Sequence, residues 1–516
     1  MASGFAIRKN EYYDSVFLMG INKRLGEAAG VEQTAVLMGT EANKRLLTEL
    51  GIAGPAIATA RPNDLIIAVI AESDRTVQEV INSLDVILKT MVAGRQTSGV
   101  RTLDAALERT PTANLAVYSI PGEYVTDEAL KALEAGLNLF IFSSNVPLSK
   151  ELELKQFGRA KNLLVMGPDC GTSIIDGVGI GFANVVRRGT VGVVGPSGTG
   201  LQEFTTRVHN AGGGISHAIG TGSNDLSDEI GGITTLMALQ MLEADTRTEV
   251  LAIIAKPPGT RTLASLLEQA QKFRKPLIAC FLGSEKGAPV DGDPIQWART
   301  IDDAAELALQ AAGVAPSGLK DGDKQETQEQ LAAVRERGSD EARYLRGLFA
   351  GGTFCYQSQQ ILRDEGIPVY SNGPIDKKFK LADPYISHEH TLIDMGDEFF
   401  TLGKPHPMID STERAKRILV EAADPSVAIL LLDFIFGYNA SKDPVGDLLD
   451  ALQQAQAIRR RAGSKLTIVA SVCGTKDDPQ DLDLQVKMLE ENGVLVFHSN
   501  ARAVLYCKKL IMEQLL

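Results

Sequence analysis

Several features that would assign this chain to a specialised class are missing from its 516 residues. Its five cysteines, at positions 170, 280, 355, 473 and 507, are widely spaced and form no CxxC pair, so neither a disulfide framework nor a zinc site is predicted. No apolar run approaches the roughly 20 residues that span a bilayer, and the first residues lack the apolar segment of a signal peptide. We therefore expect a cytoplasmic protein that does not bind membranes.

Positive charge is also in short supply. The 52 Lys and Arg residues are outnumbered by 65 Asp and Glu residues, which gives a net charge of −13 and argues against nucleic acid as the main partner. An anionic ligand is still compatible with this charge, because a local group of backbone amides can bind phosphate on an acidic protein. The apolar content of 44% is ordinary for a globular protein, and the length predicts several domains.

The most informative segment is VGVVGPSGTGLQEF, residues 191–204. It reads as a buried strand, a glycine-rich turn and a helix, an order that directs unpaired amides and the positive end of a helix dipole toward one point. Its spacing matches neither the dinucleotide fingerprint nor the phosphate loop of P-loop nucleotidases. We predict a phosphate or carboxylate site at Ser197, Gly198 and Thr199; a tight turn without a ligand is the alternative.

A second segment repeats this pattern about 150 residues later. In FAGGT, residues 349–353, a strand again runs through glycines and a threonine into a helix, which makes Gly351, Gly352 and Thr353 the second half of the predicted site. If the two helix starts face each other, they can hold one phosphate dianion between them.

Strands and helices alternate along most of the chain, which predicts an α/β protein built from several Rossmann- or flavodoxin-like modules with parallel sheets. The expected divisions are a small N-terminal α/β domain (1–110), two parallel-sheet modules (111–188 and 189–318), a polar linker (319–343) and a C-terminal module (344–516). Ligands of such sheets bind at the carboxyl ends of the strands.

Three residues are candidates for catalysis. His406 lies between two prolines, where a restrained histidine with a pKa near neutrality can act as an acid or a base, although a purely structural loop histidine is the alternative. Cys170 follows a predicted strand end, where nearby amides would lower the pKa of an exposed thiol; a buried, inert cysteine is the alternative. Asp169 can orient an amide or ureido group, or can cap the turn.

The remaining candidates would bind substrate. Asn145 and Thr172 follow predicted strands, Lys256 ends an apolar strand, and Lys404 precedes His406 by two residues. Asp433 interrupts an apolar run, and a carboxylate there needs a partner. The pair His388 and His390 lacks further ligands nearby in the sequence, so no metal site is predicted.

The two glycine turns, together with GPDCGT upstream of the first, resemble the succinyl-CoA synthetase family. Residues from about 114 to 314 look like the α-subunit of these enzymes, with a CoA-binding-like module at 111–188, and residues 346–516 look like the ligase domain that ends the β-subunit. The whole chain more closely resembles FdrA proteins, through segments that include DCGTSII, GTVGVVGPSGTG, LAIIAKPPG, IDMGDEFFTLGKPHPMID and CGTKDDP.

The resemblance implies a function and also limits it. FdrA proteins are associated with oxamate carbamoyltransferase of anaerobic allantoin and purine breakdown, which works with two other subunits and interconverts oxalurate and phosphate with oxamate and carbamoyl phosphate. In the synthetases, the helices after the two glycine turns receive the phosphate of a phosphohistidine. Here the segment SEKGAPVDG, residues 284–292, has no histidine at that place, and the ATP-grasp domain and the glycine-rich CoA loop are absent.

The resemblance to FdrA proteins implies phosphate or carbamoyl phosphate as substrate and leaves CoA open as a ligand. It also implies a homo-oligomer within a multisubunit complex. A CoA-dependent acyl ligase that needs a separate ATP-binding chain and a non-catalytic scaffold subunit are the alternative functions.

Overall fold

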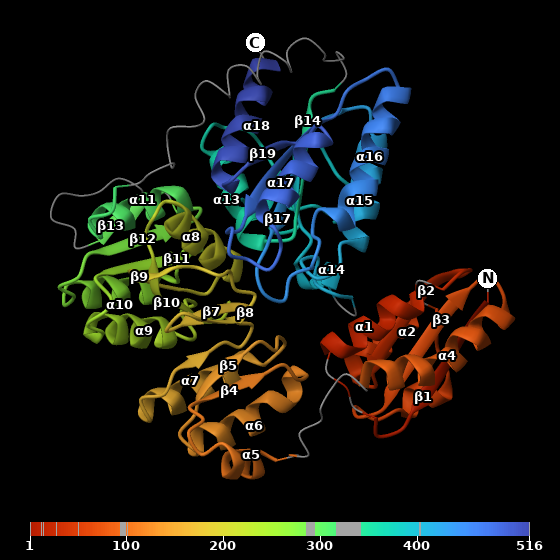
Figure 1. Ribbon diagram of the computed structural model, residues 1–516, viewed down its shortest axis with the longest axis horizontal. Helices are drawn as coiled ribbons and strands as arrows, with labels where there is room; N and C mark the ends of the chain where they lie inside the picture. The colour runs from red at the N-terminus through yellow and green to blue at the C-terminus, as the bar shows by residue number, and fades with distance from the viewer. Residues whose placement is uncertain are drawn as a thin grey trace. The chain divides into compact units, whose positions relative to one another are not determined.

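The computed structural model describes residues 2–11, 13, 15–26, 28–49, 51–92, 100, 102–284, 295–315, 342–401 and 404–514 (Figure 1). The chain forms two compact units, one of residues 1–113 with 398–405, the other of residues 114–397 with 406–516. Most of the predicted linker lies outside the described residues. Within the described ranges, no helix is both long enough and apolar enough to cross a membrane.

The first unit is a small antiparallel sheet covered by helices. Its strands are β1 (Ala2–Arg8), β2 (Val31–Met38) and β3 (Leu65–Ala71), in the order β1-β3-β2 with both pairs antiparallel. The all-apolar sequence LIIAVIA places β3 in the centre, where nearly all of its side chains are buried. The helices of this unit are α1 (Ser15–Gly26), α2 (Glu41–Glu49), α3 (Pro55–Thr59), α4 (Asp74–Val92), α5 (Leu103–Arg109) and α14 (Glu398–Thr401).

The second unit begins with a three-stranded parallel sheet, β4 (Leu115–Tyr118), β5 (Asn138–Ile141) and β6 (Val165–Met166). Helices α6 (Gly122–Glu134) and α7 (Leu148–Ala160) connect these strands. A buried ion cluster joins α7 to the loop before α9: Lys155 Nζ lies 2.7 Å from Glu151 Oε1 and 2.8 Å from Asp225 Oδ1, with all three side chains fully buried.

A seven-stranded sheet follows, in the order β13-β12-β11-β9-β10-β7-β8. The five strands from β13 to β10 are parallel, and β7 and β8 add an antiparallel edge. The strands β7 and β8 lie within the predicted module 111–188. They nevertheless join the seven-stranded sheet, where β7 pairs with β10 and β8, and they do not pair with β6. The elements are β7 (Thr172–Ile175), β8 (Val178–Gly181), β9 (Arg188–Gly195), α8 (Gly198–Asn210), β10 (Ile215–Gly220), α9 (Ile233–Ala244), β11 (Val250–Ala255), α10 (Thr260–Ala270), β12 (Leu277–Phe281), β13 (Ile295–Ala298) and α11 (Ile301–Ala311).

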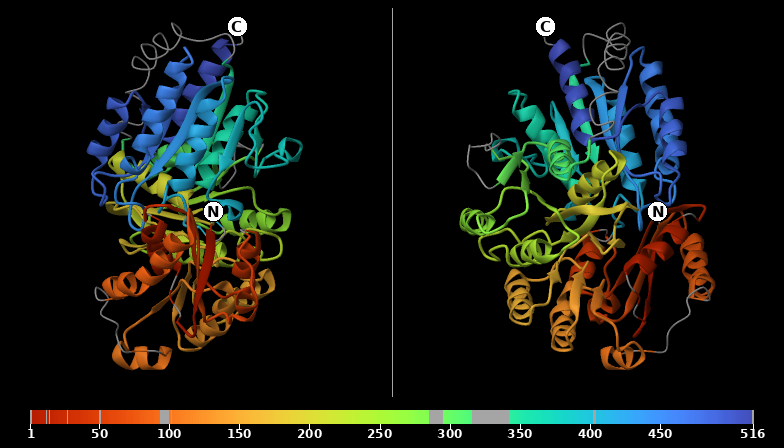
Figure 2. Two further views of the ribbon diagram at one scale, coloured as in Figure 1. Left: turned by 90° about the vertical axis from the view of Figure 1, so that its right-hand side faces the viewer. Right: turned by 60° about the vertical axis from the view of Figure 1, so that its left-hand side comes forward.

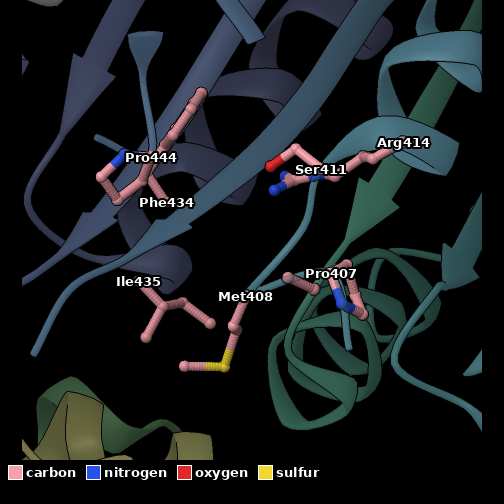
Figure 3. A pocket seen from close by; sticks show the side chains of 8 residues that line it. Pro407, Met408, Ser411, Arg414, Phe434, Ile435 and Pro444 are labelled. Atoms are coloured by element: carbon pink, nitrogen blue, oxygen red, sulfur yellow. The ribbon is translucent and has the colours of Figure 1, made fainter. Parts of the chain in front are cut away.

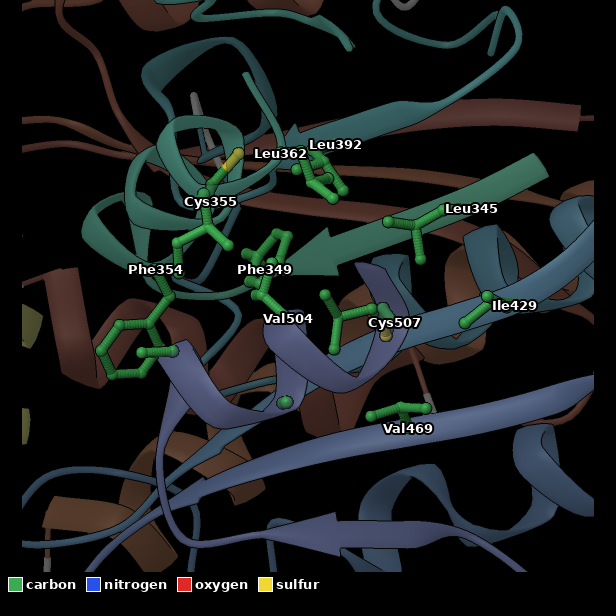
Figure 4. Packing of buried hydrophobic residues seen from close by; sticks show 14 of the residues in the cluster. Leu345, Phe349, Phe354, Cys355, Leu362, Leu392, Ile429, Val469, Val504 and Cys507 are labelled. Atoms are coloured by element: carbon green, nitrogen blue, oxygen red, sulfur yellow. The ribbon is translucent and has the colours of Figure 1, made fainter. Parts of the chain in front are cut away.

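The last module contains a six-stranded, all-parallel sheet in the order β15-β16-β14-β17-β18-β19, and Figure 2 shows these strands between their helices. Its main core lies between the sheet and two helices, where Leu345, Phe349, Phe354 and Val504 pack together (Figure 4). The elements are β14 (Tyr344–Phe349), α13 (Gly352–Arg363), β15 (Tyr370–Ser371), β16 (Thr391–Asp394), α15 (Thr412–Ala423), β17 (Val427–Ile435), α16 (Gly446–Arg461), β18 (Thr467–Cys473), α17 (Leu482–Glu491), β19 (Leu495–Phe497) and α18 (Asn500–Gln514).

This arrangement confirms the predicted fold class of several parallel-sheet α/β modules. A buried polar network fastens the two larger modules to each other: Glu203 of α8 accepts the Asn500 N–H at 2.7 Å and the Gln357 side-chain amide at 3.4 Å. Burial raises the pKa of Glu203 to about 8. The network fixes α8 beside α13, and the candidate site lies at the starts of these two helices.

Candidate functional site

Helix α8 starts where β9 ends. Its N-cap residue is Ser197, whose side-chain oxygen accepts the N–H of Gly200 at 3.0 Å. An α-helix leaves its first few N–H groups without intrahelical partners, and this cap satisfies one of them. The N–H groups of Gly198 and Thr199 meet no acceptor within the described residues, so they remain available to a ligand.

Helix α13 starts in the same way after β14, with Gly351 as its N-cap. Here the carboxylate of Asp433 accepts hydrogen bonds from the two amides that precede the helix. Its Oδ1 accepts the N–H of Ala350 and its Oδ2 that of Gly351, each at 2.8 Å. The next two amides, of Gly352 and Thr353, have no acceptor in the described parts of the chain.

The two helix starts meet. The hydroxyls of Ser197 and Thr353 are in direct hydrogen-bond contact, and a side-chain carbon added at Gly351 would lie 3.1 Å from Thr199. Residues 156 positions apart in the chain therefore form one group of amide and hydroxyl donors. We call Ser197, Gly198, Thr199, Gly351, Gly352 and Thr353 the amide cradle; Ser197 to Thr199 and Gly352 are half-buried, so part of it is open to solvent.

An ion pair supports the cradle from within the sheet. Arg414 of α15 and Asp433 of β17 are both buried, with Arg414 Nη2 2.7 Å from Asp433 Oδ1, and the guanidinium also donates to the carbonyl of Leu348. Asp433 thus has the partner that its position in an apolar strand required. A small hollow beside this pair is lined by Pro407, Met408, Ser411 and Pro444, together with Ala350 and Arg414 (Figure 3).

A second carboxyl group lies at the start of α13. Asp394 ends β16 next to β14, and a side-chain carbon at Gly352 would collide with its Oδ2. Burial raises the pKa of Asp394 to about 7; Asp397 and Asp433 also raise it, whereas Lys256 and the Gly396 N–H oppose the rise. Lys256 follows β11 and lies over the ring of Tyr356, with Nζ 4.8 Å from the ring centre.

His406 lies beside this carboxyl group, but its chemistry differs from the prediction. A carbon added at Gly396 would be 2.8 Å from His406 Nε2 and 3.2 Å from Asp394 Oδ1. Burial lowers the pKa of His406 to about 4, so the predicted pKa near neutrality is wrong. Its Nδ1 accepts the Met408 N–H at 3.2 Å, which leaves Nε2 as the protonated nitrogen of the neutral ring.

Cys170 is not an exposed thiol. It is 1% exposed, its Sγ lies 3.7 Å from the carbonyl of Thr172, and burial raises its pKa to about 12. The alternative of a buried, inert cysteine is therefore confirmed, and the accessible thiol with a lowered pKa is wrong, because the chain continues from Cys170 directly into the buried strand β7. Thr172 is also buried, yet it reaches the cradle: its Oγ1 would lie 3.1 Å from a side-chain carbon at Gly198.

The other candidates lie at the edge of the first parallel sheet or in the other unit. Asn145 and Asp169 are exposed residues with positive φ after β5 and β6, and the Asp169 N–H donates to the carbonyl of Ser143 at 3.0 Å. Lys404 lies in the segment 398–405, which belongs to the first unit and is described with that unit alone.

Sequence reasoning missed two residues of this site, Asp394 and Arg414. The sequence does contain a signal for Asp394: it is a single carboxylate at the end of the apolar strand TLID. Asp433 has a similar position, as a single carboxylate within the apolar run LLLDFIF. Within the described ranges, no group of three or more His, Cys, Asp or Glu side chains could hold a metal ion.

Three domain families match parts of this chain. Residues 348–510 match the family described as CoA-ligase, residues 186–281 the CoA binding domain, and residues 1–103 the domain described as "AllF, heavy metal-associated domain". The CoA-binding match runs over strands β9 to β12 of the seven-stranded sheet and shares only residues 186–188 with the span 111–188. The AllF match contains no cysteine, although thiolates are the ligands that soft metals favour.

One relative extends over the full length. YahF of Escherichia coli K12, a protein named as uncharacterized, is 41% identical over 515 residues, which are 99% of each chain. The chain belongs to the family of YahF. This FdrA-like family combines an AllF-type domain with succinyl-CoA-synthetase-like domains, so the coarse part of the predicted resemblance is confirmed.

Other relatives match only part of this chain. The α-subunit of the ADP-forming succinate–CoA ligase of Aquifex aeolicus is 28% identical over 180 residues, or 33% of this chain and 57% of that protein. Among solved structures, a dinucleotide-forming acetyl-coenzyme A synthetase of Ca. Korarchaeum cryptofilum in complex with phosphate and ADP is 18% identical, with a TM-score of 0.29 over 78% of this chain and 85% of that one.

Proposed function

We propose that this protein is the FdrA-type subunit of an oxamate carbamoyltransferase that works in allantoin and purine nitrogen recovery. The observation that supports the proposal is the contact between the starts of α8 and α13, which contain the amides of Gly198, Thr199, Gly352 and Thr353. The AllF-type N-terminal match and the family of YahF support the link to allantoin breakdown.

The reaction suits a site of this kind. Phosphate, or the phosphoryl end of carbamoyl phosphate, would lie on the cradle while one of its oxygens attacks or leaves the carbamoyl carbon. Two helix dipoles and preorganised amides would stabilise the added negative charge, and one such donor contributes about 2.7 to 4 kcal/mol in other enzymes. Lys256 and the Nε2–H of His406 would add a cation and a donor beside the carbamoyl group.

This chemistry uses no nucleotide and no phosphohistidine, in keeping with the absence of histidine from residues 284–292. The substrate would be phosphate or carbamoyl phosphate. We propose two other carbamoyltransferase subunits as partners and a homo-oligomeric form of this chain within the complex.

A CoA-dependent acyl ligase is the second candidate, favoured by the matches to the CoA-ligase and CoA-binding families. It would need a separate ATP-binding chain. A non-catalytic scaffold subunit is the third candidate.

The test is phosphate-dependent release of oxamate from oxalurate by the reconstituted complex. Gly198→Val fills the cradle and should abolish this activity, whereas Gly373→Val is the matched control, because a side chain at Gly373 meets nothing within 4 Å. Dependence on CoA and ATP in place of phosphate would favour the ligase. Full activity of the Gly198→Val complex would favour the scaffold.

A further inference from the structure

Asp394 is held rigidly against the cradle. Its backbone N–H donates to Asn372 Oδ1 and its carbonyl accepts from Asn372 Nδ2, both at 2.9 Å, and Oδ1 accepts the Gly396 N–H at 2.9 Å. Its Oδ2 lies against Gly352, the first residue of α13. An anion bound to the Gly352 amide would therefore contact this carboxyl group.

Charged and titratable groups from five other segments face Asp394. They are Lys256 after β11, Asp397 in the following loop, Asp433 on β17, His406 before α15 and the buried thiol of Cys355 on α13. The nearby carboxylates and burial favour the protonated carboxylic acid, whereas Lys256 favours the carboxylate. The balance of these influences raises the pKa of Asp394 to about 7, so both its protonated and its ionised form are accessible near neutral pH.

The proposed reaction needs such a group, since a proton must change places. When an oxygen of hydrogenphosphate attacks the ureido carbon of oxalurate, the new O–C bond forms carbamoyl phosphate and the C–N bond to the oxamate nitrogen breaks. The hydrogenphosphate loses its proton, and the leaving nitrogen, which takes the electron pair of the broken bond, must gain one to become the amide of oxamate. No proton is gained or lost overall.

We propose that Asp394 carries this proton, taking it from the hydrogenphosphate on the cradle and giving it to the leaving nitrogen of oxamate. The inference rests on the proposed function and assigns a catalytic residue to it. In the reverse direction, Asp394 takes a proton from the oxamate amide and returns it to phosphate.

The other candidate groups suit this role less well. His406 binds a proton only at acid pH because its pKa is about 4, and the pKa of Cys170, about 12, keeps that thiol protonated. Glu203 is 2% exposed and already bonded to Asn500 and Gln357.

The first experiment measures whether Asp394 titrates at the anion site, using sulfate because it stays a dianion between pH 5.5 and 8.5. The purified chain should bind sulfate about tenfold more tightly at pH 5.5 than at pH 8.5, because an ionised carboxylate repels the anion. Asp394→Asn should bind sulfate tightly at both pH values. The control Asp450→Asn removes the same charge from an exposed position on α16 and should keep the pH dependence.

The second experiment uses the reconstituted complex. Asp394→Asn should lower kcat for phosphate-dependent oxamate release about 10²- to 10⁴-fold and remove the ionisation near pH 7 from the kcat profile. An Asp394→Asn complex with the wild-type kcat and profile would overturn the inference and leave the carbamoyl transfer standing. A wild-type complex without this activity would overturn the proposed function, and the proton transfer with it. Equal pH dependence of sulfate binding in Asp394→Asn and wild type would also overturn the inference.

Discussion

Replacing Asp433 with asparagine tests the buried ion pair that supports the second glycine turn. The carboxylate of Asp433 is 0% exposed, accepts the amides of Ala350 and Gly351 at 2.8 Å, and pairs with Arg414, which is 3% exposed, at 2.7 Å. Asparagine keeps one acceptor oxygen, but its NH₂ group must face a donor, and Arg414 loses its counter-ion.

The expected cost follows from these contacts. Removing one partner of a buried ion pair typically destabilises a protein by about 3–5 kcal/mol, because the remaining charge stays buried without compensation. We therefore expect Asp433→Asn to lower the free energy of unfolding of the C-terminal module by about 3–5 kcal/mol, measured by urea unfolding followed by circular dichroism. Sulfate binding should weaken as well, because residues 350 and 351 lead directly into α13.

A matched control separates this effect from a general change of charge. Asp450→Asn changes an exposed aspartate that bonds only to Gln454 among the described residues, at 2.7 Å, and should alter stability by less than about 0.5 kcal/mol. A loss below about 1 kcal/mol for Asp433→Asn would refute the view that the pair holds the turn.

Further predictions concern buried charges and titrating groups. Lys155→Ala leaves two buried carboxylates without their cation and should cost about 3–5 kcal/mol in the same urea assay; a loss under about 1 kcal/mol would contradict the ion cluster. Cys170 should resist a thiol reagent in the native protein because burial raises its pKa to about 12, and labelling at the rate of a free thiol would contradict its burial. Because the pKa of Asp394 rises from 3.8 to about 7 on folding, its contribution lowers stability as the pH rises through this window, so Asp394→Asn should be more stable than wild type at pH 8; equal stability there would refute the shift. The pKa of His406 falls from 6.5 to about 4 on folding, so the contribution of this residue to stability is lost as the pH falls from 6.5 to 4; the stability of wild type relative to His406→Asn should decrease over this range, and a constant difference between the two would contradict the shift.

Local sequence patterns predicted those parts of the site that depend only on residues close to one another in the sequence. The starts of α8 and α13 follow from a strand, glycines and a small polar residue within about ten positions, although α8 begins at Gly198, earlier than the start near Leu201 that the pattern predicts. The same pattern could not establish that Ser197 touches Thr353, since that contact depends on how two modules pack.

The errors arose where a side chain's environment comes from distant segments. The neighbours Gly396 and Asp397 affect the pKa of Asp394, but Lys256, Gly352 and Asp433, which also surround it, are distant in the sequence. The pKa of His406 depends on burial that two flanking prolines do not reveal. Cys170 follows a strand end, where exposure is plausible, but β7 enters a second sheet directly after it and the thiol becomes part of the core.

The proposed carbamoyl transfer depends on one oxyanion site formed by both helix starts. A crystal structure of the chain with saturating phosphate is the direct test of that site. We expect a phosphate ion within about 2.7–3.1 Å of at least one amide from Gly198 or Thr199 and one from Gly352 or Thr353. A phosphate bound elsewhere, with these four amides facing only water, would contradict the proposed oxyanion site.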